Sequence, residues 1–330
     1  MTPSTANEAH GSTSAQLLSE PIVKAFARHE TFHPRYGWIK KGFDAAASDS
    51  EAFLRPDAAV TLGVGKNMVR AIRYWCRAFK VIAELPGSEH SRMLVAEPTA
   101  FGTALLADEG WDPYLENPAS LWLLHWQLLK APCFAPAWYA VFNGTYIGSV
   151  TDSALLREVE LMRDAHPAWA DVVDASLKKD VDCLLRMYAP RRAKNKSLED
   201  TLDSPFGALG LIGAVEADRH LYNIQMGPKE GLSDEVVMYS ILDFMAGRAA
   251  AGGKTVLFSR LAYDENSPGR IFRLGESDLT SAARRFAAGM AEIDVVEVAG
   301  SPQLVLRQPP SGLALEALRR LYEGVGSFVG

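Results

Sequence analysis

Residues 62–80, LGVGKNMVRAIRYWCRAFK, carry the clearest local signal of a fold. The two glycines of this stretch bracket a tight turn, and apolar residues recur at helical spacing from Lys66 to about Ala83. Residues 56–62 before the turn predict a short helix, and residues 93–96 could supply the strand of a small wing. Two helices joined by a glycine turn and followed by a wing predict a winged helix-turn-helix.

The helix after this turn carries a basic face. At 100° per residue, its cations fall within a strip roughly 80° wide; they are Lys66, Arg70, Arg73, Arg77 and Lys80. No acidic residue between Lys66 and Val81 offers a neutralising pair on the same helix. A DNA major groove admits such a helix, with its N-terminal residues at the base edges. We therefore expect Lys66, Asn67 and Arg70 to reach bases, and Arg73, Arg77 and Lys80 to contact phosphates. The alternative is a solvated charged surface.

Composition limits the class of protein. With 330 residues, 48% of them hydrophobic and 22% charged, the chain has the balance of a globular protein. A formal net charge of −6 argues against a protein that coats nucleic acid everywhere, so any DNA contact must be local. Three widely spaced cysteines indicate neither disulfides nor structural zinc, which favours the cytoplasm. No apolar stretch is long enough to span a membrane, and a nucleotide cofactor is not expected because the GxxxxGK[ST] pattern fails before Lys66.

We predict a mainly α, α+β fold in three units after a disordered tail at residues 1–19. Residues 20–108 form the winged helix-turn-helix domain, residues 109–230 a helical middle domain, and residues 231–330 a winged-helix-like C-terminal domain. The sequence leaves a monomer and a homodimer as open alternatives.

Local signals place further elements. We expect helices over residues 21–29, 36–47 and 167–188, and helices that start near Asn117, Thr151, Ser233 and Glu276. Residues 295–298 and 303–307 predict a hairpin, and residues 191–197 an exposed hinge. On the helix that starts near Asn117, we interpret His125 as a core histidine.

Several long stretches resemble the bacterial SspB-like family. They are RHETFHPRYGWIKKGF at 28–43, LGVGKNMVRAIRYW at 62–75, WDPYLE at 111–116, WLLHW at 122–126, KDVDCLL at 179–185 and PGR at 268–270. The resemblance covers most of the chain. It implies a nickase of double-stranded DNA that serves phosphorothioate modification, the replacement of a phosphate oxygen by sulfur in phage defence. It also implies as partners a cysteine desulfurase, an ATP pyrophosphatase-like sulfur-transfer enzyme and an ATPase. A non-catalytic DNA-binding scaffold or a transcriptional regulator is the alternative.

The resemblance transfers no catalytic motif, so the candidates come from residue chemistry. Residues 29–33 fit HExxH, but Pro34 disfavours helical geometry at His33, and we interpret the segment as a turn in which His29 and Glu30 are weak catalytic candidates. Strand cleavage usually uses metal-bound carboxylates, which makes Mg or Mn the expected cofactor. Asp180 and Asp182 point about 200° apart on a helix and are interpreted as surface ion pairs. The remaining acidic candidates, on a more flexible segment, are Glu199, Asp200 and Asp203.

A second group of cations precedes the helix-turn-helix. Arg35, Lys40 and Lys41 stand in and just after the turn at Pro34. Because a helix-turn-helix normally sets a neighbouring helix across the DNA backbone, we expect these residues to clamp phosphates. Surface cations that only aid solubility are the alternative.

Overall fold

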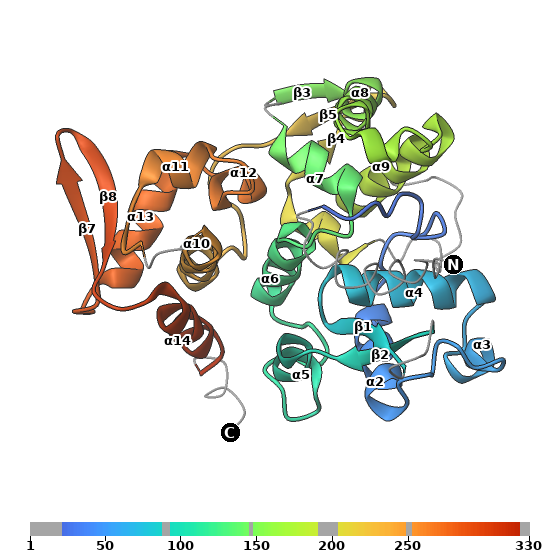
Figure 1. The fold of residues 1–330 in the computed structure, drawn as a ribbon. Helices are drawn as coiled ribbons and strands as arrows, with labels where there is room; N and C mark the ends of the chain where they lie inside the picture. The colour runs from blue at the N-terminus through green and yellow to red at the C-terminus, as the bar shows by residue number, and fades with distance from the viewer. Residues whose placement is uncertain (1–21, 88–92, 145–147, 191–203, 249–252, 324–330) are drawn as a thin grey trace, which may run out of the picture.

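A computed structural model describes residues 22–87, 93–144, 148–190, 204–248 and 253–323 (Figure 1). The predicted tail at residues 1–19 and the predicted hinge at residues 191–197 lie outside these ranges. No helix of the described ranges is both long enough and apolar enough to cross a membrane.

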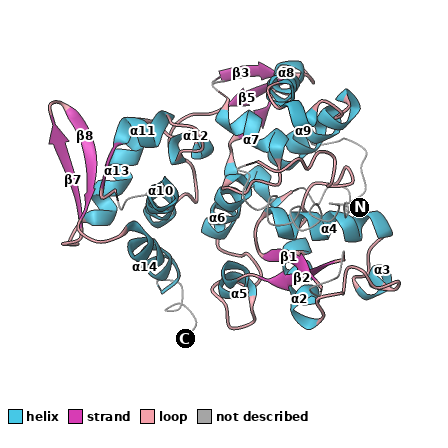
Figure 2. Cartoon of the chain, in the orientation of Figure 1, coloured by secondary structure: helices cyan, strands magenta, loops and turns pink. Residues whose placement is uncertain are grey.

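The N-terminal part has helices, a glycine turn and a two-stranded sheet in the order expected for a winged helix-turn-helix. Its elements are α2 (Trp38–Ser48), α3 (Ala58–Thr61), α4 (Lys66–Ala78), β1 (Ile82–Pro86), β2 (Leu94–Pro98) and α5 (Ala100–Leu106). Helix α2 packs across α4, and β1 pairs antiparallel with β2 to form the wing (Figure 2). Gly63 takes a φ of +61°, a conformation that glycine adopts without strain, and so permits the turn between α3 and α4.

Two predictions for this part are wrong. Helix α4 ends at Ala78 and not near Ala83, because Lys80 takes a φ of +58° and the chain turns into β1. In the predicted 21–29 helix, Ile22 instead forms a β-bridge with Cys133, and residues 26–29 form turns in which Ala27 has a φ of +54°. A helix cannot continue through residues in this left-handed conformation.

The middle part is mainly helical and carries one small sheet. Its elements are α6 (Pro118–Leu129), α7 (Pro136–Asn143), β3 (Gly148–Thr151), α8 (Asp152–Asp164), η1 (Pro167–Trp169), α9 (Asp174–Tyr188), η3 (Pro205–Leu209), β4 (Ile212–Ala214) and β5 (Leu221–Ile224). The side chain of Asn117 accepts from Ala119 N, and that of Thr151 from Ala154 N, so both predicted helix starts are confirmed. The predicted 167–188 helix is instead a short 3-10 turn, a break and α9.

The C-terminal part contains a second three-stranded sheet, whose β7–β8 hairpin lies at its outer edge (Figure 1). Its elements are α10 (Asp234–Arg248), β6 (Thr255–Leu257), α11 (Phe258–Tyr263), α12 (Pro268–Phe272), α13 (Glu276–Ala287), β7 (Ile293–Val298), β8 (Ser301–Leu306) and α14 (Pro310–Glu323). The strand order is β6-β8-β7, and the predicted hairpin is confirmed as β7 and β8. Helix, strand, helices and hairpin follow one another as in a winged helix. In Figure 1 this part lies at the opposite side from α2–α4, with α6 between them.

One connected apolar core runs through all three parts, from Ile22 to Tyr322. His125 belongs to it: the ring is fully buried, with Nδ1 2.7 Å from Tyr188 Oη and Nε2 3.1 Å from Ile271 O. Burial lowers the pKa of His125 to about 3, so the imidazole is neutral. The prediction of a core histidine is confirmed.

Candidate nucleic-acid interface

The N-terminal end of α4 presents the residues predicted to read bases. Lys66, Asn67 and Arg70 are exposed, whereas Val69 and Ile72 on the opposite side are buried. Arg70 keeps 58% of its side chain exposed and approaches one acid, Glu30, at 3.4 Å. The helix periodicity therefore sorts the solvent side from the core side, as the sequence predicts. This end of the helix is free to meet an anionic partner.

The middle of α4 is held against the wing. Arg73 Nε lies 2.7 Å from Glu84 Oε1, and Arg77 NH1 lies 2.8 Å from Glu84 Oε2. The Arg77 guanidinium also lies 4.1 Å from the centre of the Phe134 ring. Glu84 belongs to β1, so a search for acids along the helix itself could not find this pairing. The side chains of Arg73 and Arg77 are therefore held in position by contacts within the protein.

Lys80 does not belong to the basic face, and its expected phosphate contact is corrected by the structure. It follows the end of α4, is half-buried, and its ammonium donates to the carbonyl oxygen of Gln127. Burial lowers the pKa of Lys80 to about 8. Helical periodicity of 100° per residue placed Lys80 on the basic face, and this prediction is wrong because the helix ends two residues earlier, at Ala78.

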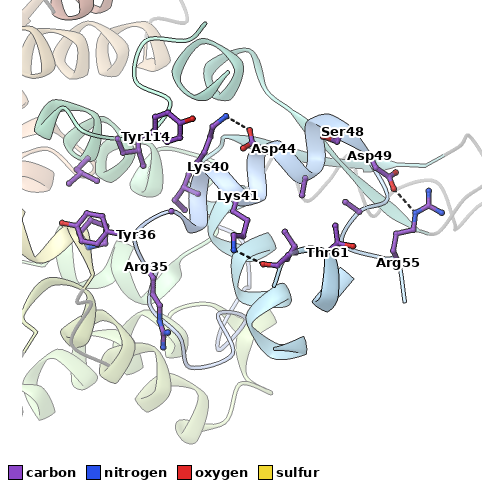
Figure 3. A pocket seen from close by; sticks show the side chains of 18 of the residues that line it. Arg35, Tyr36, Lys40, Lys41, Asp44, Ser48, Asp49, Arg55, Thr61 and Tyr114 are labelled. Atoms are coloured by element: carbon purple, nitrogen blue, oxygen red, sulfur yellow. Dashed lines mark hydrogen bonds and ion pairs between the residues drawn. The ribbon is translucent and has the colours of Figure 1, made fainter. Parts of the chain in front are cut away.

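The cations expected to clamp phosphates line a hollow of about 680 Å³ beside α2 (Figure 3). Lys40 bridges Asp44 at 2.7 Å and Asp108 at 2.8 Å, which occupies its ammonium within the protein. Lys41 donates to the carbonyl oxygen of Leu62, at the turn that precedes α4. The Arg35 guanidinium lies 5.4 Å from the Trp38 ring. Of the three cations, Lys41 is the one tied to the helix-turn-helix itself.

His29 is not placed where it could meet a phosphate. Its ring is fully buried between aromatic rings of α4 and α7, and Nε2 lies 2.6 Å from Asp180 Oδ1. Ala27 N donates to the same Asp180 oxygen at 2.8 Å. Burial raises the pKa of Asp180, although the contact with His29 opposes this shift. His29, a weak catalytic candidate from the sequence, is therefore the buried partner of Asp180, and the interpretation of Asp180 as a surface ion pair is wrong.

The HExxH segment is a turn, as interpreted from the sequence. Glu30 and Thr31 take φ values of +51° and +67°, so two histidines one helical turn apart do not arise. Glu30 is half-buried beside Arg70, at the edge of the interface. Glu199, Asp200 and Asp203 lie outside the described residues. Within the described ranges, no group of three or more His, Cys, Asp or Glu side chains is placed to hold a metal ion.

The chain resembles known proteins over nearly its whole length. It matches the family described as "Protein of unknown function (DUF4007)" over residues 26–322. It is similar to two solved structures, "SspB crystal structure" and "Magnesium ion-bound SspB crystal structure", each at 38% identity over 95% of this chain and 92% of the other, with TM-scores of 0.85 and 0.86. No curated protein matches. These likenesses show that the chain belongs to the DUF4007 family and is an SspB-like protein.

Proposed function

We propose that this protein binds duplex DNA through α4 and nicks one strand, as the SspB-like component of a phosphorothioation system. The observation that carries the DNA binding is the exposed N-terminal end of α4. There Lys66, Asn67 and Arg70 follow a glycine turn and precede a wing, the arrangement by which a second helix enters a major groove. Arg73 and Arg77 extend the same face toward the wing, where they would meet phosphates.

Kinship with SspB supports the place of this protein in sulfur modification of DNA, within the cytoplasm. The partners that we propose are a cysteine desulfurase, an ATP pyrophosphatase-like sulfur-transfer enzyme and an ATPase. One of the similar structures holds magnesium, and magnesium or manganese is the cofactor that we propose for the cut, since divalent ions activate water and stabilise the leaving oxygen.

A supercoiled plasmid tests both halves of the proposal. We expect purified protein with magnesium or manganese to convert supercoiled plasmid to open circles, because one broken strand releases the supercoils. A Lys66→Glu, Arg70→Glu variant should lose both plasmid binding and nicking, since both side chains are exposed and reversal repels the phosphates. An Arg157→Glu variant on α8 is the matched control, with a side chain 61% exposed.

The alternatives give different results in the same experiment. Retained DNA binding with intact plasmid would support a scaffold, and tight binding to one short sequence without nicking would support a transcriptional regulator. Wild-type protein that binds no duplex would contradict the proposal.

A further inference from the structure

A second groove, of about 330 Å³, runs between residues 23–28 and the middle of α4. The charged side chains that line it are Lys24, Arg28, Arg70, Arg73, Arg77 and Glu84. They are five cations and one acid, and so they carry a net charge of +4 in a chain whose formal net charge is −6. Two further acids stand beside the groove, Asp171 against Lys24 and Glu30 against Arg70. Such a local excess of positive charge attracts a polyanion.

One wall of this groove is rigid. Arg73 is held by Glu84 and by the carbonyl oxygen of Leu94, which NH2 reaches at 2.8 Å. Arg77 is held by Glu84, and its guanidinium lies over the ring of Phe134, which also lines the groove. Fixed guanidinium groups lose little side-chain entropy when they meet a ligand. Glu84 therefore positions two arginines along the groove.

The other wall carries a free arginine on a fixed turn. The backbone on either side of Arg28 is anchored, because Ala27 N donates to Asp180 and His29 is buried against the same carboxylate. Arg28 itself is exposed, and its side chain has no partner within the described part of the chain. Its guanidinium is thus available to an incoming anion, although sequence alone gave no reason to select it.

We propose that this groove binds the phosphate backbone of one DNA strand, with Arg28 as the direct contact and Arg73 and Arg77 as the fixed wall. The inference rests on the proposed DNA binding and extends the interface from α4 to residues 23–28. DNA is the occupant that fits, because a linear polyanion follows a groove lined by cations from two segments. The contacts carry no sequence information, since phosphates are the same in every site.

Arg28→Ala tests the groove, with Arg157→Ala as a control that removes an equal charge from an exposed arginine on α8. Affinity of the full chain for a mixed-sequence 20-base-pair duplex is measured across a salt series. We expect Arg28→Ala to bind about 5- to 10-fold more weakly near 0.1 M salt, with a salt slope lower by about 0.9. Arg157→Ala should bind as the wild type does, and thermal unfolding of both variants should stay unchanged.

Lys66→Ala separates failure of the groove from failure of the proposed function. If Lys66→Ala weakens binding while Arg28→Ala matches the wild type, the groove does not hold DNA and the α4 interface stands. If wild-type protein binds no duplex at all, both proposals are overturned.

Discussion

At the scale of single residues, Lys80 is a cation withdrawn from bulk water. Its folded pKa of about 8 lies below the unfolded value near 10.5, so between these pH values the unfolded chain binds more protons. The contribution of Lys80 to stability therefore rises as pH increases through this window. We predict that the free energy of unfolding of the wild type, measured relative to that of Lys80→Met, rises by on the order of 2 kcal/mol between pH 7 and pH 10. Urea unfolding at several pH values measures it, and a constant difference would contradict it.

Asp180 anchors the turn at residues 27–29, which packs against α4 through His29 and Trp75. Its carboxylate serves both His29 and the amide of Ala27 in a buried position, so its loss leaves those groups without their acceptor. We predict that Asp180→Ala lowers the free energy of unfolding by about 3 kcal/mol. Asp182→Ala, two residues along the same helix and exposed, should change it by less than about 0.5 kcal/mol. Equal effects of the two substitutions in urea unfolding would count against this role.

At the scale of elements, the wing and α4 are joined through Glu84. The glutamate side chain is only 10% exposed and faces two arginines, so its removal leaves neighbouring cations unpaired. We predict that Glu84→Ala destabilises the protein by about 2 kcal/mol, less than a fully buried pair because both arginines reach solvent. Glu97→Ala, an exposed glutamate on β2, is the matched control, and its unfolding free energy should stay within about 0.5 kcal/mol of the wild type.

Whether an element could be predicted from the sequence depends on how local the signal for it is. The starts of α6 and α8 and the β7–β8 hairpin were predictable, because caps and alternation act within a few residues. The end of α4, the pairing of Glu84 and the burial of Asp180 were not, because each depends on a partner placed by tertiary structure. Asp180 meets a histidine 151 positions away. For the candidate site, helical periodicity therefore identified the exposed end of α4. It did not predict that Arg28 lines a groove beside α4, or that Lys80 lies outside the basic face.

Within the whole molecule, a chain of net negative charge places five cations along the groove between α4 and residues 23–28. The predicted phosphate clamp beside α2 would widen this basic surface. Two of its residues, Lys40 and Lys41, differ in their partners within the protein. Lys40 is committed to two carboxylates, so reversing its charge would disturb Asp44 and Asp108 as well as any DNA contact. Lys41 can be tested alone, because its partner within the described ranges is a carbonyl oxygen.

We predict that Lys41→Gln weakens binding to every duplex sequence alike, by about 5-fold near 0.1 M salt, with a salt slope lower by about 0.9. The physical reason is that Lys41 reaches the turn before α4, where the DNA backbone would pass if α4 lies in the major groove. Two duplexes of unrelated sequence, each measured across a salt series, show whether the loss is uniform. Lys254→Gln is the control, an exposed lysine in the C-terminal part that also donates to a carbonyl oxygen. Wild-type affinity of Lys41→Gln at both sequences would remove α2 from the interface and leave α4 with the groove beside it.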